Sequence, residues 1–206
     1  MSAQTTGTTQ ELMVDFITSL DGYGSADGWP GLWGLEGPEY LAWLETQPQR
    51  DFIVLMGSKT YDLMSGMAQS ASTEGTFSDY ETDAFSGLAA ADKVVISSTL
   101  QPPYALPNTT VLSGDAVELV TELKRTATKP IHTLGSVSLC RTLMAAGLVD
   151  KFRVVIFPVI TGRTGRDRIY DDYEDFVLDL VESRTFDNRS QLLEYVPRKV
   201  DAPLSR

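Results

Sequence analysis

The chain is poor in the residues on which most metal sites and catalytic triads depend. It contains one cysteine, Cys140, and one histidine, His132, among 206 residues. An intrachain disulfide and a cysteine metal cluster are therefore excluded, and a histidine-rich metal site or a Ser-His-Asp triad is disfavoured. Cys140 stands beside Leu139 and Leu143 on an expected helix. We therefore interpret it as a small buried hydrophobic residue rather than a reactive thiol.

Basic residues and long apolar runs are also scarce. The 17 Lys and Arg are outnumbered by 28 Asp and Glu, which gives a formal net charge of −11. Because nucleic-acid binders need clustered cations, we do not expect a nucleic-acid partner. No apolar run approaches the roughly 18 residues that a membrane span needs. The polar first 11 residues carry no signal-peptide pattern. We therefore expect a cytoplasmic protein without a membrane partner.

Apolar runs and amphipathic segments alternate along most of the chain. They predict a single domain at residues 12–197, with a flexible tail at residues 1–11 and another at 198–206. Buried strands are expected at residues 12–18, 51–57, 93–97, 110–112 and 131–134. A proline-bearing loop connects the third strand to the fourth, helices connect the others, and residues 69–78 are expected to form a polar loop. This order predicts an α/β fold with a mostly parallel central sheet and helices on both faces. Residues 176–182 and 191–196 follow without an intervening helix and predict an antiparallel C-terminal hairpin.

Residues 129–162 are the most informative segment. They read as a short apolar strand, a small-residue turn, a helix, and a second apolar strand that ends in Pro-Val-Ile-Thr-Gly. A small-residue turn leaves N–H groups uncovered at the N-terminus of the helix, where an anion such as a pyrophosphate is stabilised. The residues of this turn are Gly135, Ser136, Val137 and Ser138.

Two other expected strands also end in small polar turns. One turn consists of Gly57, Ser58, Lys59 and Thr60, and the other of Ser97, Ser98 and Thr99. In an open α/β sheet, ligands bind outside the carboxyl ends of the strands, so the turns are expected to converge on one cleft. The alternative is that each turn is an ordinary strand–helix cap. No turn has the spacing of a dinucleotide fingerprint or of a phosphate loop.

Taken in order, these motifs resemble the dihydrofolate reductase-like superfamily. The order is Asp-Gly after the first strand, Gly-Ser-Lys-Thr-Tyr, Val-Ile-Ser-Ser-Thr-Leu, Gly-Ser with its helix, Gly-Leu-Val-Asp and Pro-Val-Ile-Thr-Gly. The resemblance covers residues 12–195 and is greatest to the C-terminal reductase domain of the bifunctional riboflavin-biosynthesis deaminase-reductase. It implies the three-layer dihydrofolate reductase-like fold. The zinc deaminase signature of the bifunctional enzyme is absent, since it needs more than one cysteine.

The resemblance implies an NAD(P)H-dependent oxidoreductase that reduces a small pterin-, pyrimidine- or flavin-like heterocycle, usually with NADPH, and that forms a homodimer. By position, Gly57, Lys59 and Thr60 would contact the cofactor phosphates. Ser97, Ser98 and Thr99 would contact the adenosine ribose. The pyrophosphate would be bound by Gly135, Ser136, Val137 and Ser138. Asp21 would lie beside the nicotinamide and the substrate. It would orient the substrate by accepting hydrogen bonds or assist protonation, although an Asp-Gly after a strand is also a common turn.

Three aromatic residues are candidate substrate contacts, and for each the alternative is a packing role in the hydrophobic core. Trp29 and Trp33 belong to a long Gly-rich loop after the first strand. They would form a lid over a flat heterocycle, or a hydrophobic flap on the core. Tyr61 lies one turn into its helix, where it would contact the substrate or pack in the core. For the homodimer, residues 152–158 and the C-terminal hairpin are the candidate interface, with a core role as the alternative.

The chain departs from the resemblance at positions that bear on specificity. Ser58 and Ser98 stand where relatives often carry an Arg that binds the 2′-phosphate, which leaves NADH possible. Lys59 and Lys93 would compensate only in part. Leu134 replaces a Glu that is typical before the turn, so the aminopyrimidine of riboflavin biosynthesis is not the expected substrate. These losses also motivate an alternative, a non-catalytic flavin-, pterin- or nucleotide-binding protein on the same fold.

Overall fold

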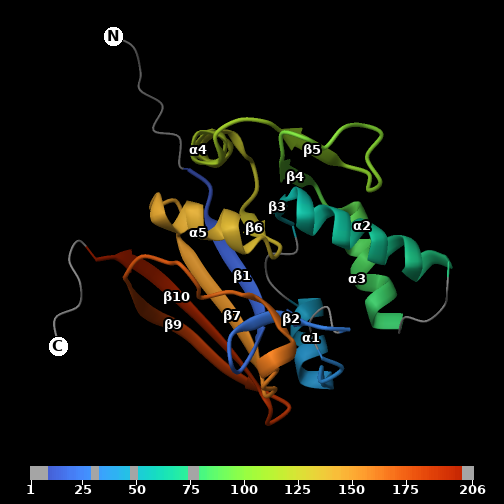
Figure 1. Cartoon of the computed structure of the whole chain (residues 1–206), viewed down its shortest axis with the longest axis vertical. Coiled ribbons are helices and arrows are strands. Elements are labelled where there is room, and N and C mark those ends of the chain that lie inside the picture. The colour runs from blue at the N-terminus through green and yellow to red at the C-terminus, as the bar shows by residue number, and fades with distance from the viewer. Residues whose placement is uncertain (1–8, 29–32, 47–50, 74–78, 201–206) are drawn as a thin grey trace.

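A computed structural model of the chain describes residues 9–28, 33–46, 51–73 and 79–200. Its core is an eight-stranded sheet with the strand order β5-β4-β3-β6-β1-β7-β10-β9 (Figure 1). The strands are β1 (Leu12–Ser19), β3 (Ile53–Gly57), β4 (Lys93–Ile96), β5 (Thr109–Leu112), β6 (Ile131–Thr133), β7 (Lys151–Phe157), β9 (Phe176–Phe186) and β10 (Ser190–Lys199). β10 therefore runs past the domain boundary expected at residue 197.

The sheet is parallel from β5 to β7 and antiparallel beyond. β1 pairs in parallel with β6 and β7, and β3 pairs in parallel with β4 and β6. β10 is antiparallel both to β7 and to β9. The predicted mixed sheet and its antiparallel C-terminal hairpin are thus confirmed. β1 lies near the middle because its apolar side chains alternate between two buried faces.

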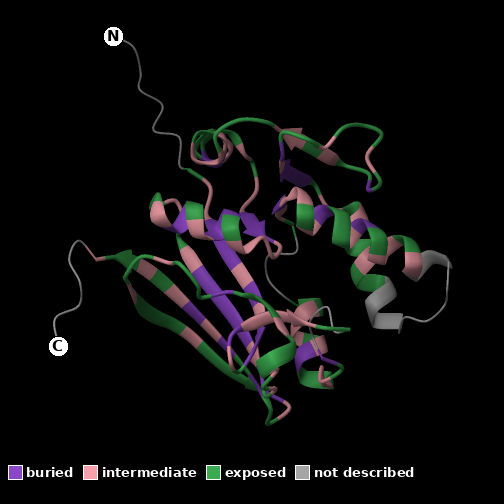
Figure 2. Ribbon diagram, viewed as in Figure 1, coloured by how far each residue is buried: buried purple, intermediate pink, exposed green. Residues whose placement is uncertain are grey.

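Helices cover both faces of the sheet, as predicted. On one face, α4 (Ala116–Thr126) and α5 (Val137–Ala145) pack on Val14, Phe16 and Leu55. On the other face lie α1 (Pro38–Thr46), α2 (Ser58–Thr73) and α3 (Asp79–Ala90). Buried residues are concentrated on the central strands (Figure 2). No helix in the described part of the chain is long and apolar enough to cross a membrane.

A second, two-stranded sheet was not expected from the sequence. β2 (Tyr23–Ala26) pairs antiparallel with β8 (Gly165–Arg168), just after the short 3₁₀ helix η1 (Gly162–Thr164). We call β2 and β8 together the β2–β8 ribbon. The polar loop predicted at residues 69–78 was wrong for residues 69–73. These residues belong to α2, which continues to Thr73 and packs against α3.

Of the two candidate interface segments, residues 152–158 follow the core alternative. β7 lies between β1 and β10 and is mostly buried. β9 instead forms the edge of the sheet. Its apolar side chains Leu178, Leu180 and Val181 are 38%, 56% and 54% exposed.

Candidate functional site

The predicted polar turns lie along one edge of the central sheet. Parallel strands end on the same side, so β4, β3, β6, β1 and β7 present their carboxyl ends in that order (Figure 1). Pairing of Gly57 with Ile96, and of Ser19 with Phe157, brings neighbouring strands to an end at the same level. The turns after β3, β4 and β6 are therefore neighbours, as expected for one ligand-binding edge.

The Ser136 hydroxyl joins the turn after β6 to the turn after β3. Its Oγ accepts a hydrogen bond from the Gly57 N–H at 2.8 Å and donates one to Thr60 Oγ1 at 2.8 Å. Ser136 has a φ of 65° and Gly135 a φ of 54°, so both residues are in the left-handed region. A Cβ on Gly135 would lie 3.4 Å from Thr60 Cγ2. The close approach of the two turns thus favours glycine at position 135.

This use of Ser136 leaves the N-terminus of α5 without a side-chain cap. Ser136 is the N-cap residue, yet its side chain accepts no hydrogen bond from the helix. α4 differs, because the Asp115 carboxylate there accepts from the N–H groups of Val117 and Glu118. The N–H groups in the first turn of α5 therefore remain available to an anion, which the helix dipole also favours.

The turn after β4 uses its first serine for its own structure. Ser97 Oγ accepts hydrogen bonds from the N–H groups of Thr99 and Leu100, at 3.2 and 3.0 Å. Ser98 and Thr99 are exposed. Of the three predicted contacts in this turn, Ser98 and Thr99 present free surface, whereas the Ser97 hydroxyl holds the turn together.

Lys93 cannot serve as a phosphate ligand. Its ammonium is buried and donates to the carbonyl oxygens of Leu88, Ala89 and Ala91 at 2.7, 3.0 and 2.6 Å. Burial lowers the pKa of this ammonium, and nearby Asp92 opposes the change. The expectation that Lys93 compensates for a missing arginine was therefore wrong. Lys59, at the start of α2, is exposed.

Asp21 fastens the loop after β1 to the segment after β7. Its carboxylate accepts from Ser19 Oγ at 2.6 Å, from the Thr161 N–H at 3.1 Å and from the Gly162 N–H at 2.8 Å. Burial by itself would raise the pKa of Asp21, but these hydrogen bonds lower it to about 2. A carboxyl that is ionised at neutral pH cannot donate a proton, so the protonation role is not retained. Acceptance of a substrate hydrogen bond stays a prediction.

The comparisons with known proteins bear on the family and the fold of the chain. The family model of the RibD C-terminal domain matches residues 10–192. The chain belongs to the RibD C-terminal domain family. Among related proteins, the Bacillus subtilis protein YyaP is 28% identical over 178 residues, which cover 86% of this chain and 89% of that one.

Two solved structures show the same fold as this RibD C-terminal domain. One is the diaminohydroxyphosphoribosylaminopyrimidine deaminase/5-amino-6-(5-phosphoribosylamino)uracil reductase of Thermotoga maritima, with a TM-score of 0.62 and 15% identity over 92% of this chain and 57% of that one. The other is the dihydrofolate reductase of Enterococcus faecalis complexed with NADP(H), with a TM-score of 0.57 and 15% identity over 92% and 97% of the two chains. The predicted dihydrofolate reductase-like fold is therefore confirmed.

Of the aromatic candidates, Trp33 and Tyr61 lie in two separate core clusters of this RibD C-terminal domain. Trp33 is 5% exposed and packs on Phe157, with ring centroids 6.0 Å apart. Tyr61 is 2% exposed, and its hydroxyl accepts the Leu106 N–H at 3.0 Å. Both residues follow the core alternative. The Trp33 indole and the Tyr61 phenol ring are each part of a hydrophobic core cluster. Trp29 lies outside the described residues.

Cys140 is the buried hydrophobic residue that the sequence predicted. It lies fully buried on α5, and burial raises the pKa of its thiol to about 12. A thiol in this state is not a nucleophile at neutral pH.

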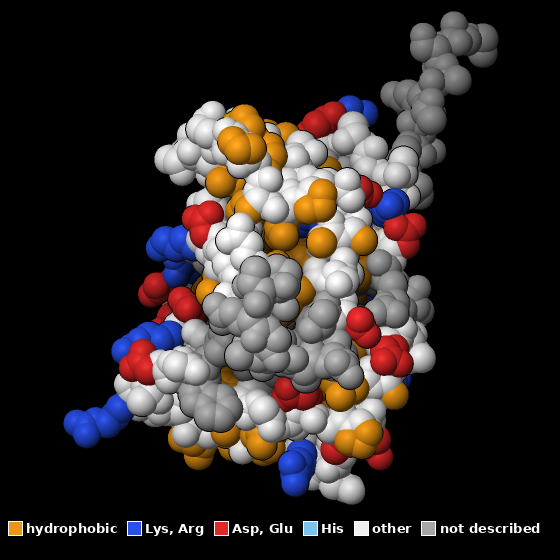
Figure 3. All heavy atoms as spheres, turned by 90° about the vertical axis from the view of Figure 1, so that its right-hand side faces the viewer, with side chains coloured by type: hydrophobic (Ala, Val, Ile, Leu, Met, Phe, Trp, Pro, Cys, Tyr) orange, Lys and Arg blue, Asp and Glu red, His pale blue; other side chains and the backbone are white. Residues whose placement is uncertain are grey.

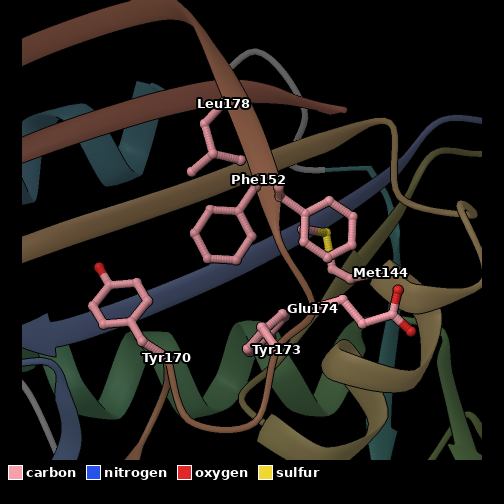
Figure 4. A pocket seen from close by; sticks show the side chains of 7 residues that line it. Met144, Phe152, Tyr170, Tyr173, Glu174 and Leu178 are labelled. Atoms are coloured by element: carbon pink, nitrogen blue, oxygen red, sulfur yellow. The ribbon is translucent and has the colours of Figure 1, made fainter. Parts of the chain in front are cut away.

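A small apolar cavity of about 150 Å³ lies away from the predicted turns (Figure 4). It is found at the C-terminal end of α5, whereas the turn at Ser136 precedes the N-terminal end. None of the predicted site residues lines it. Its walls are Met144, Phe152, Tyr170, Tyr173, Glu174, Phe176 and Leu178.

The partners of Asp21 were not predicted from the sequence. Ser19, Thr161 and Gly162 hold its carboxylate, and the Gly22 carbonyl accepts the Ile169 N–H at 2.9 Å beside the β2–β8 ribbon. The Thr-Gly that closes the Pro-Val-Ile-Thr-Gly motif was a visible signal. Its proximity to Asp21 depends on the pairing of β7 with β1, which the motif does not specify.

Proposed function

We propose that this chain is a nicotinamide-dependent reductase that transfers a hydride to a small pterin-, pyrimidine- or flavin-like heterocycle. The observation that carries the proposal is the uncapped N-terminus of α5, tied through Ser136 to the N-terminus of α2. The two similar structures support the proposal. The Thermotoga maritima protein is a deaminase/reductase, and the Enterococcus faecalis dihydrofolate reductase is complexed with NADP(H).

The chemistry of the turns fits a dinucleotide. Residues 57–60, 97–99 and 134–138 contain no Asp or Glu and contribute backbone N–H groups, hydroxyls and one ammonium. Phosphate oxygens accept hydrogen bonds and do not donate them, so a set of donors suits them. We assign Val137 and Ser138 to the pyrophosphate, Lys59 and Thr60 to the neighbouring phosphate oxygens, and Ser98 and Thr99 to the adenosine ribose.

The cofactor, when bound, supplies the hydride. The protein's task is to bind and orient the two reactants. Asp21, anionic and hydrogen-bonded to Thr161 and Gly162, holds the segment that leads into the β2–β8 ribbon next to the end of β1. In this role it fixes one wall of the substrate pocket and offers a carboxylate oxygen to a substrate N–H.

The decisive variant is Ser138→Asp. A carboxylate in the first turn of a helix favours helix formation, so the fold is expected to be as stable as in the wild type or more so. The same charge repels a pyrophosphate, and we expect the affinity for NADH and NADPH to fall about tenfold or more. Ser138→Asn, of equal size and neutral, is the matched control and should retain most of the affinity. Cofactor titration by nicotinamide fluorescence measures both.

Turnover separates the reductase from the non-catalytic alternative. Loss of nicotinamide absorbance is followed with pterin, pyrimidine and flavin substrates. Oxidation of the cofactor with any of them supports the proposal. Binding of a heterocycle without affinity for either nicotinamide cofactor would favour a binding protein on the same fold.

We also propose that the chain acts in the cytoplasm as a homodimer formed through β9. Among the described residues β9 is the edge strand of the sheet, and its exposed Leu178, Leu180 and Val181 would be covered by a second copy. The measured mass of the particle in solution tests the dimer.

A further inference from the structure

The direction in which a dinucleotide would lie follows from the order of the strands. The proposed pyrophosphate position is the turn after β6, which lies between β3 and β1 in the sheet. On the β1 side the edge is occupied by Asp21, its hydrogen bonds to Thr161 and Gly162, and the β2–β8 ribbon. On the β3 side it ends in the short turns after β3 and β4. The proposed function places the substrate beside Asp21, so the nicotinamide belongs to the β1 side and the adenosine half to the side of β3 and β4.

The adenosine side carries little positive charge. Its turns contribute Ser58 at the start of α2 and Ser98 after β4, and neither side chain carries a charge that could pair with a 2′-phosphate. Lys59 is the only Lys or Arg in the two turns. Lys93, the next cation, is held by the three carbonyls at the end of α3. Asp62 follows Ser58 by one turn of α2, on the same helix face, and adds negative charge.

Charge of both signs lies at the margins of one face of the molecule. Figure 3 shows its Lys and Arg side chains mainly there, with Asp and Glu side chains among them. The whole chain carries a formal charge of −11, which adds a general repulsion toward a dianion. A ribose with a free 2′-hydroxyl needs no cation and can be bound by the Ser and Thr hydroxyls present.

We infer that this protein prefers NADH to NADPH, and that Ser58 and Ser98 are the residues that determine this preference. The inference rests on the proposed function. A 2′-phosphate at this site would lose the charge-assisted, often bidentate contacts that an Arg supplies, and a single flexible Lys replaces them poorly. The affinity for NADH is therefore expected to exceed that for NADPH by about tenfold.

Titration of the wild-type protein with NADH and with NADPH, at the same salt concentration, tests the inference. Tighter binding of NADH is the expected result. Equal affinities, or tighter binding of NADPH, would overturn the preference while leaving the proposed function intact. Affinity for neither cofactor would overturn the proposed function, and the preference with it.

Two arginine variants test the residues. Ser58→Arg and Ser98→Arg should each raise the affinity for NADPH about tenfold or more and change that for NADH much less, since only NADPH carries the 2′-phosphate. Thr110→Arg, at an exposed position within β5, adds the same charge away from the carboxyl edge and should leave the ratio of the two affinities unchanged. If Thr110→Arg raised the affinity for NADPH as much as the two variants, general charge rather than Ser58 and Ser98 would determine the preference.

Discussion

Removal of the Ser136 hydroxyl is predicted to loosen the junction of the two turns. Ser136→Ala deletes the acceptor of the Gly57 N–H and the donor to Thr60 Oγ1, both at 2.8 Å. A partly buried N–H left without a partner costs about 1–3 kcal/mol. The alanine also stays in the left-handed region, where Ser136 has a φ of 65°.

Ser136→Gly separates the lost hydrogen bonds from the backbone conformation. Glycine loses the same hydroxyl, but it adopts positive φ without the roughly 1 kcal/mol that a Cβ costs there. The expected order of unfolding free energy is therefore wild type, then the glycine variant, then the alanine variant. With about 2–4 °C per kcal/mol for a chain of this size, a loss of about 1–3 kcal/mol should make the alanine variant melt about 2–12 °C below the wild type.

Urea denaturation and thermal melting followed by circular dichroism measure these differences. Ser138→Ala, at an exposed position two residues further along, is the matched control and should stay within about 0.5 kcal/mol of the wild type. The reasoning fails if Ser136→Ala is as stable as the wild type. It also fails if the alanine variant is more stable than the glycine variant.

Further predictions concern four other positions. Burial lowers the pKa of His132 to about 4, so protonation opposes folding, and stability is lost as pH falls from 6.5 toward 4. His132→Phe keeps the stacking on Phe52 and should remove up to about 3 kcal/mol of that pH dependence, as measured by urea denaturation at several pH values. If the unfolding free energy of the variant fell with pH as steeply as that of the wild type, the role of His132 would be refuted. Lys93→Met should lower the unfolding free energy by about 1–3 kcal/mol, because three carbonyls lose their donor. The affinity for NADH in a fluorescence titration should not change. A weaker affinity would contradict a purely structural role for Lys93. The folded-state pKa of Asp21 is about 2, below its usual 3.8, so its stabilising effect is present above pH 3.8 and is lost as pH falls toward 2. Asp21→Asn should reduce the pH dependence of the unfolding free energy in that range. An unchanged pH dependence would contradict the stabilising hydrogen bonds of the Asp21 carboxylate. Leu180→Glu at the exposed edge should convert particles of about twice the 22.6 kDa chain mass into monomers, as judged by light scattering; an unchanged mass would refute an interface at β9.

The regular elements could be predicted because local pattern and tertiary packing agree in them. β1 and β7 are runs of mainly apolar residues buried on both faces, and both were expected as strands. The β2–β8 ribbon could not be found in this way. Its strands read YGSA and GRDR, which contain no apolar alternation. They pair because Asp21 and Gly22 bind backbone groups of the distant segment around residues 161–169.

The site was predictable as a set of turns, but its internal bonds were not. Residue type and strand order indicated that Gly57, Ser97 and Gly135 would meet at one edge. The left-handed conformation of Ser136 directs its hydroxyl across to Gly57 instead of into its own helix, and a serine gives no local sign of this. Trp33 was ambiguous for a related reason, since an indole in a Gly-rich loop suits a lid and a core equally, and only the packing on Phe157 decides.

The most direct test of the account is a crystal structure of the protein with bound NADH. The account predicts pyrophosphate oxygens about 2.7–3.2 Å from the backbone nitrogens of Val137 and Ser138 at the N-terminus of α5, with the adenosine directed toward Ser98. A pyrophosphate elsewhere on the molecule, for example near the cavity at the other end of α5, would contradict it.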